Sequence, residues 1–209
     1  MSRLLSRRRI LFDALFVVPL VGGCHVLPDP APAQIYRLSP LTNDRPKGPQ
    51  LRKRLVVDIP TASESLDTDR IALIRDRTRF GYYANSLWTD RVPVLLQALL
   101  VQAFENNSHI AAVARDAGAL TPDYVLETEI RDFQARYAGP GERAPAVMVA
   151  LSLSLVRMPD HRMVGQTVMS ESAPASSNSL DGIIETFDLV VGRVLMQTIA
   201  WTERAIGRG

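Results

Sequence analysis

The sequence predicts an α+β fold, in which a single mixed and mostly antiparallel sheet carries two helices on one face, as a two-layer α/β sandwich. Apolar and polar residues alternate along 124–137 and 147–155, which is typical of half-buried strands. Apolar residues recur at helical spacing in 90–106 and 179–204. Strands therefore come in runs, each followed by one helix, and this order favours one sheet covered by both helices over alternating strand–helix units.

Four short strands are expected before the first helix. The last two form a hairpin, because the turn signal Asp76-Arg77-Thr78 separates them. Residues 39–54 and 61–69 are polar or rich in Pro, Gly and basic side chains, so both are expected to be loops. In chain order, the four expected strands are residues 34–38, 55–59, 70–75 and 79–88.

The two helices have recognisable starts. A side-chain oxygen of Thr89 or Asp90 is expected to cap the first helix, and Pro93 falls in its first turn, where proline is tolerated. Ser179 is the expected cap of the second helix. Each helix has one broad apolar face, so we expect both to pack against the sheet.

The strand expected over 124–137 changes phase along its length. Up to Ile130 the apolar residues are even-numbered and Glu127 and Glu129 point to the opposite face. From Phe133 onward the apolar residues are odd-numbered. One extra residue in a bulge near Asp132 would absorb this slip.

The strand expected over 147–155 has two unlike faces. Its odd-numbered positions are Val or Leu, which predicts contact with the core. Further strands are expected at 110–114 and 163–171, with a loop of small residues at 172–178. The side chains expected on the opposite face, including the residue just before this strand, are small or polar: Ala146, Ala150, Ser152 and Ser154.

The first 23 residues are expected to be a lipoprotein signal peptide. A basic start is followed by the short apolar stretch 10–21, and then by Gly22-Gly23-Cys24. We expect lipid on Cys24, the only cysteine of the chain, since an unpaired cysteine in an exported protein needs a role. An ordinary cleaved signal or an anchor helix is the alternative, and the Ser6–Leu11 segment leaves general and twin-arginine export both open.

Residues 24–33 are expected to be a proline-rich tether. Prolines at 28, 30 and 32 favour extended chain, which would hold the domain on the order of 25 Å from the bilayer. A flexible tether without a spacing role is the alternative. The tether would lead into one domain at 34–205.

The basic charge of the chain belongs to its first segment. The formal net charge is +2, and residues 1–23 contain four arginines and one aspartate, so the chain from Cys24 onward is near −1. No basic stripe remains of the kind that binds nucleic acid. We therefore expect no nucleic-acid partner.

The sequence contains no motif for catalysis, and we expect neither an enzyme nor a cofactor or metal. His25, His109 and His161 are scattered singly, whereas a metal site needs several ligands at defined spacing. Nucleophile-elbow, phosphate-loop and dinucleotide-binding motifs are absent from the sequence. An acylated Cys24 could not serve as a nucleophile.

The hairpin carries the candidate residues for contact with a partner. Arginines there alternate with apolar residues, and three aromatic side chains lie in the second strand. Solvated edge-strand arginines and aromatic core packing are the plainer alternatives. The candidates are Arg70, Arg79, Tyr82, Tyr83 and Trp88.

Several motifs in succession resemble the auxiliary lipoproteins of ABC-type transport systems, the PqiC-like family. The resemblance covers roughly residues 34–204. The motifs are Leu66-Asp67-Thr68-Asp69-Arg70-Ile71, then Tyr82 to Trp88-Thr89-Asp90, then Val113-Ala114-Arg115, then Tyr124-Val-Leu126 to Ile130-Arg-Asp-Phe133.

This resemblance implies an α/β sandwich without catalytic residues, which accompanies an ATPase, a permease and an MCE-domain (mammalian cell entry) protein in lipid transport. It implies a lipid-anchored protein of the cell envelope that faces the periplasm. Whether the protein forms a homo-oligomer is left open. His25 after the cysteine, rather than Asp, favours the outer membrane. An assembly lipoprotein of outer-membrane biogenesis or secretion is the alternative, and an envelope hydrolase would need a nucleophile–base pair that the sequence does not show.

Overall fold

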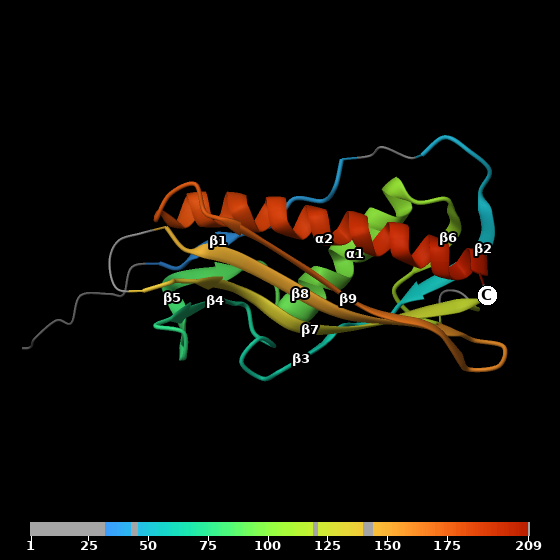
Figure 1. The fold of residues 1–209 in the computed structure, drawn as a ribbon, viewed down its shortest axis with the longest axis horizontal. Coiled ribbons are helices and arrows are strands. Elements are labelled where there is room, and N and C mark those ends of the chain that lie inside the picture. Colours follow the sequence, from blue (N-terminus) through green and yellow to red (C-terminus); the bar gives the residue numbers. More distant parts are fainter. Residues whose placement is uncertain (1–31, 43–45, 119–120, 140–143, 209) are drawn as a thin grey trace, which may run out of the picture. The chain divides into compact units, whose positions relative to one another are not determined.

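The structure is a computed structural model that describes residues 32–42, 46–118, 121–139 and 144–208. These residues form a large open sheet of nine strands together with two helices (Figure 1). The α+β fold class predicted from the sequence is confirmed. The expected signal peptide, Cys24 and most of the expected tether lie outside the described residues.

The long strand β7 (Tyr124–Arg136) forms the centre of the sheet. One of its edges pairs antiparallel with β8 (Ala146–Arg157), which in turn pairs antiparallel with β9 (Arg162–Pro174). Its other edge pairs in parallel with three strands in succession: β2 (Leu51–Val57), β3 (Thr61–Ala62) and β4 (Arg70–Arg75). The remaining strands are β6 (Ile110–Ala114) beside β2, β5 (Arg79–Trp88) beside β4, and β1 (Gln34–Tyr36) beside β5.

Both irregular points predicted in these strands are present. The β7–β8 register shifts between Ile130 and Asp132, which places the expected bulge. The β4–β5 hairpin turns at Asp76 and Arg77, which have φ angles of 49° and 68°. Two successive residues with positive φ are the geometry of the tight turn that matches the twist of a hairpin.

Helix α1 (Val92–Asn107) starts differently from the prediction. Arg91 occupies the cap position and makes no side-chain cap hydrogen bond, so the predicted cap by Thr89 or Asp90 is wrong. The backbone carbonyl of Thr68 accepts the Val92 N–H at 3.1 Å instead. A backbone carbonyl of the preceding loop therefore accepts the hydrogen bond that a capping side chain would otherwise accept.

Helix α2 (Leu180–Arg208) starts as predicted, because the Ser179 hydroxyl accepts a hydrogen bond from the Gly182 N–H at 3.2 Å. The helix runs along the length of β8 and β9 (Figure 1). No helix among the described residues is long and apolar enough to cross a membrane.

The hydrophobic core fills the space between the helices and one face of the sheet. Trp88, Phe133 and Phe187 meet there, with ring centroids 5.2–5.9 Å apart, and connect β5, β7 and α2. The odd-numbered row of β8 is fully buried against the helices, as predicted: Val147, Val149, Leu151, Leu153 and Leu155.

Three expected loops contain strand. Strand β2 begins at Leu51, four residues before the expected start, because its backbone pairs with β6 while Arg52 and Lys53 point to solvent. Strand β3 lies within the loop expected at 61–69. Strand β9 also extends to Pro174, into the loop expected at 172–178. In each case the segment is a strand because its backbone pairs with a neighbouring strand. Such pairing leaves no pattern of apolar residues in the sequence.

Candidate functional site

The face of the sheet that the helices leave uncovered, here called the open face, carries small and polar side chains. Directly paired residues of adjacent strands share a face of the sheet. Two cross-strand rows of the open face follow from the register: Glu127 beside Ser154 and Gln166, and Glu129 beside Ser152 and Val168. The alternation in the sequence predicts this chemistry for β7 and β8.

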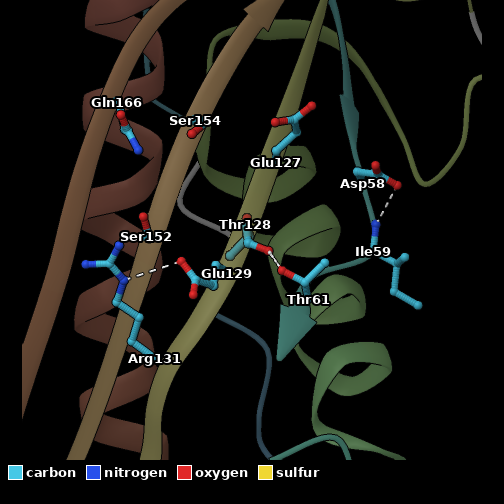
Figure 2. Close-up of a pocket in the computed structure, with 10 residues that line it drawn as sticks. All are labelled: Asp58, Ile59, Thr61, Glu127, Thr128, Glu129, Arg131, Ser152, Ser154 and Gln166. Carbon is cyan, nitrogen blue, oxygen red and sulfur yellow. Dashed lines mark hydrogen bonds and ion pairs between the residues drawn. The ribbon is translucent and has the colours of Figure 1, made fainter. Parts of the chain in front are cut away.

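A groove crosses the open face beside the segment that joins β2 to β3. Its volume is about 290 Å³. Figure 2 shows side chains from three strands of the sheet pointing toward the viewer, with the helices behind the sheet. The lining residues, which define the open-face groove, are Asp58, Ile59, Thr61, Glu127, Thr128, Glu129, Arg131, Ser152, Ser154 and Gln166.

Carboxylates outnumber cations in the open-face groove. Asp58, Glu127 and Glu129 supply three carboxylates, and Arg131 is the single basic residue among the lining residues. The Arg131 Nε atom lies 3.4 Å from a carboxylate oxygen of Glu129, and Figure 2 shows this pair at one side of the groove. The groove therefore has an excess of negative charge.

Ser152 contributes a hydroxyl to the groove. This residue is only 7% exposed, and its hydroxyl makes no hydrogen bond with another described residue. Nearby, the Thr61 hydroxyl donates a long hydrogen bond of 3.5 Å to the backbone carbonyl of Thr128, which holds β3 against β7. The Ser152 hydroxyl is thus free to bind a ligand group.

A second cluster on the open face contains two of the residues predicted to contact a partner. The guanidinium carbon of Arg70 lies 3.7 Å from the centre of the Tyr82 ring, in a cation–π contact. Phe80 meets the same ring edge-on at 5.4 Å and is 42% exposed. The Tyr82 hydroxyl donates to the Ser65 carbonyl at 3.0 Å. We call Arg70, Phe80 and Tyr82 the aromatic cluster.

The other three candidates lie elsewhere. Arg79 pairs with Asp76 at the hairpin turn and is exposed. Tyr83 is half-buried and its hydroxyl lies 3.0 Å from that of Tyr137. Trp88 is 2% exposed within the core, so this surface role does not apply to it. Its burial follows from packing against aromatic rings of β7 and α2, which the sequence pattern of β5 alone does not reveal.

The Tyr83–Tyr137 pair has a clear physical basis. Tyr137 donates to the Asn178 side-chain oxygen at 3.0 Å, so the Tyr83 hydroxyl donates to Tyr137. Burial, followed by this hydrogen bond, raises the pKa of Tyr83 far above its ordinary value. The chain of hydroxyls links β5, the end of β7 and the loop before α2.

The histidines that the structure describes are well separated from the groove. The Nδ1 atom of His109 lies 3.1 Å from a carboxylate oxygen of Glu203, which joins the end of α1 to α2. His161 adopts a positive φ of 50° in the β8–β9 turn. Among the described residues, no three His, Cys, Asp or Glu side chains are grouped so as to hold a metal ion.

Comparison with known sequences places the chain in a family. Residues 36–200 match the sequence model of a family described as "ABC-type transport auxiliary lipoprotein component". The chain belongs to this family. The resemblance predicted from the motifs is therefore confirmed across most of the described fold.

Two relatives support the assignment. The chain is 31% identical over 178 residues to the uncharacterized protein bll6063 of Bradyrhizobium diazoefficiens. That match covers 84% of this chain and 47% of the relative, so the chain spans about half the length of the curated relative. It is also similar to the crystal structure of protein XCC0632 from Xanthomonas campestris, with a TM-score of 0.77 and 27% identity over 84% of this chain and 98% of that one.

A more distant structure shares the fold alone. The hypothetical protein CT253 from Chlamydia trachomatis has a TM-score of 0.53 and 9% identity, and the match covers 76% of this chain and 100% of that one. The two-layer arrangement therefore persists where sequence similarity has almost disappeared.

Proposed function

We propose that this protein is a non-enzymatic accessory lipoprotein, which docks the periplasmic part of an ABC-type lipid-transport system at a membrane. The observation that carries the proposal is the open face. A sheet face of this size with half-buried hydroxyls, carboxylates and an exposed aromatic ring is suited to contact with another protein. Family membership supplies the ABC-type transport context.

The anchor in this proposal is lipid on Cys24, followed by the proline-rich tether at 24–33 and the folded domain at 34–205. Stable membrane attachment needs two or more acyl chains, as expected for a lipoprotein cysteine. We propose the outer membrane as the location, with the domain facing the periplasm. The tether would let the open face reach a partner that projects from the opposite membrane.

The proposed partner is an MCE-domain protein together with the other transporter components. We assign the protein a binding role because the open-face groove and the aromatic cluster present polar and aromatic side chains on the open face. The groove is lined mainly by strand residues, and its carboxylates belong to exposed residues, which suits recognition of a charged surface.

Site-specific photo-crosslinking in native envelopes tests the proposal. A photoreactive amino acid at Gln166 places the probe in the open-face groove, and the same amino acid at Glu185 places it on the exposed side of α2. We expect the Gln166 probe to capture an MCE or ABC-transport component and the Glu185 probe to capture neither. The Cys24→Ser variant is expected to lose membrane association and the crosslink together.

The proposal fails if neither position captures a transport component. Capture of a secretion or outer-membrane assembly protein instead would support the alternative role in envelope assembly. Capture from Glu185 alone would show that docking uses the helix layer, and it would overturn the open face as the site.

A further inference from the structure

We propose that the open-face groove binds the positively charged side chain of an arginine or lysine from the docked partner protein. This inference rests on the proposed docking function and names the chemistry that the docking surface recognises. Three independent features of the groove support it: its charge, the Ser152 hydroxyl and its apolar rim.

The charge of the groove selects a cation. Asp58, Glu127 and Glu129 face the same depression, while Arg131 is already engaged by Glu129 at 3.4 Å. The Asp58 carboxylate accepts the Ile59 backbone N–H at 2.8 Å, which fixes its position at the edge of the groove. Carboxylates placed side by side repel one another, and an incoming cation relieves that repulsion.

The Ser152 hydroxyl points to a ligand that donates hydrogen bonds. The Ser152 residue is 93% buried and lines the groove, and its hydroxyl has no hydrogen-bond partner among the described residues, so its lone pairs are available. A partner that covered it without a hydrogen bond would leave a buried polar group unsatisfied, which is costly. Guanidinium and ammonium groups bring several N–H donors and no acceptor, so they suit carboxylates and a hydroxyl together.

The rim of the groove favours a side chain with an aliphatic stem over a bare ion. Ile59 lines the groove and is 49% exposed, while Val168 is 48% exposed and lies just outside the lining residues, in the same cross-strand row as Glu129 and Ser152. Arginine and lysine cover apolar surface with their methylene groups while the charged end makes polar contacts. An inorganic cation would gain nothing from this rim.

Comparison with an apolar groove elsewhere in the protein favours a protein side chain over a lipid as the ligand of the open-face groove. That second groove, of about 490 Å³, lies on the helix layer and is lined by Leu41, Leu189, Gly192 and Met196 among others. The open-face groove has no comparable apolar slot for an acyl chain beside its carboxylates. A protein side chain therefore fits it better than the head and tail of an amine lipid.

Binding of two short peptides to the full-length protein in detergent tests the inference. The probes are fluorescein-labelled Ser-Val-Arg-Val-Ser and Ser-Val-Gln-Val-Ser, followed by fluorescence anisotropy. We expect the arginine peptide to bind up to about fivefold more tightly, the effect of one charge pair at a partly exposed site. High salt is expected to abolish the preference, because exposed charges are screened.

Matched variants assign the preference to the groove. Glu127→Gln and Ser152→Ala are each expected to reduce it, whereas Glu185→Gln removes an equal charge on α2 and is expected to leave it unchanged. Circular dichroism melts of all variants check that they fold. The inference is overturned if the two peptides bind equally to the wild type, or if Glu127→Gln and Glu185→Gln have the same effect.

A lipid arm tests the other source of an ammonium group. Vesicles of phosphatidylethanolamine with phosphatidylcholine are compared with vesicles of phosphatidylcholine alone, using the Cys24→Ser variant so that the anchor does not contribute. Binding that needs phosphatidylethanolamine and Glu127, without any arginine-peptide preference, would overturn the inference in favour of a headgroup. A crosslink from Gln166 without an arginine preference would refute this inference and leave docking intact.

Discussion

Strand β8 shows how differently the two faces of the sheet are built. Its odd-numbered residues lie against the helices, and Leu151, Leu153 and Leu155 are completely buried. Its even-numbered residues belong to the open face, where Ser152 and Ser154 line the groove. The same backbone therefore carries an aliphatic layer on one side and hydroxyl groups on the other.

The difference between the two faces suggests that the helix-covered face provides stability and that the open face serves recognition. The helix-covered face contributes nearly all the apolar burial of these strands, which is the main favourable free energy of folding. Side chains of the open face are therefore free to be selected for contact with other molecules. Substitutions on the two faces should accordingly have effects of very different size.

The largest expected effect comes from the helix-covered face. Leu153→Ala removes a completely buried side chain and leaves a cavity between β8 and the helices. We expect the free energy of unfolding to fall by about 2–5 kcal/mol. Urea denaturation measures it. A cost no larger than that of the neighbouring Ser152→Ala would contradict the division of roles between the faces.

A smaller effect is expected at the hydroxyl chain where the two layers meet. Tyr83→Phe removes the hydrogen bond to Tyr137 and should cost about 1 kcal/mol at neutral pH.

The pH dependence provides an internal check on this variant. The pKa of Tyr83 is raised in the folded protein, so its contribution is complete below the pKa of an unfolded tyrosine, 10.0, and is lost as the pH rises above it. The wild type should therefore lose stability above pH 10 more steeply than Tyr83→Phe in urea denaturation. Parallel curves for the two proteins would contradict the assignment.

Ser152→Ala should barely alter stability, in contrast to its neighbour. The hydroxyl has no described partner to lose, so the free energy of unfolding should change by less than about 0.5 kcal/mol. Urea denaturation beside Leu153→Ala makes the measurement. A large destabilisation would mean that the hydroxyl already serves the fold, and the argument for a ligand at this position would lose its basis.

The smallest effect is expected in the β8–β9 turn, outside both faces. Hydrogen bonds from Arg157 lower the pKa of Asp160 to about 2. Because the pKa is lowered, the stabilisation is present above the ordinary value of 3.8 and is lost as the pH falls toward 2. NMR titration of the Asp160 carboxyl carbon measures this pKa. Arg157→Gln should return it to the ordinary range, and an unchanged value would exclude the pair as the cause.

Much of the fold could be predicted because alternation and helical spacing record which side chains face the core. The phase slip before Phe133 predicted the bulge, and Ser179 predicted the start of α2. The start of β2 and the whole of β3 could not be predicted in this way. Their pairing depends on backbone hydrogen bonds to strands that come much later in the sequence.

The candidate site could be predicted only in part, for the same reason. The pattern of β7 and β8 indicated that Glu127, Glu129 and Ser152 share a face opposite the core. Nothing in the sequence indicated that Asp58 and Ile59 form a wall beside them, because that depends on β3 returning along β7. The aromatic side chains of β5 show the converse problem, since Tyr82 is partly exposed whereas Trp88 is buried, and the sequence does not distinguish them.

Strand β7 also sets the order in which the chain can assemble. Three strands that precede it, β2, β3 and β4, have it as a parallel partner, so the ladder of each with β7 must wait for residues 124–136. Closing such long loops makes folding slow, because the entropic cost comes before the contacts. A fragment that ends before Tyr124 could form only the β1–β5–β4 and β2–β6 pairings, without the strand that joins them into one sheet, and we expect it to be prone to aggregation.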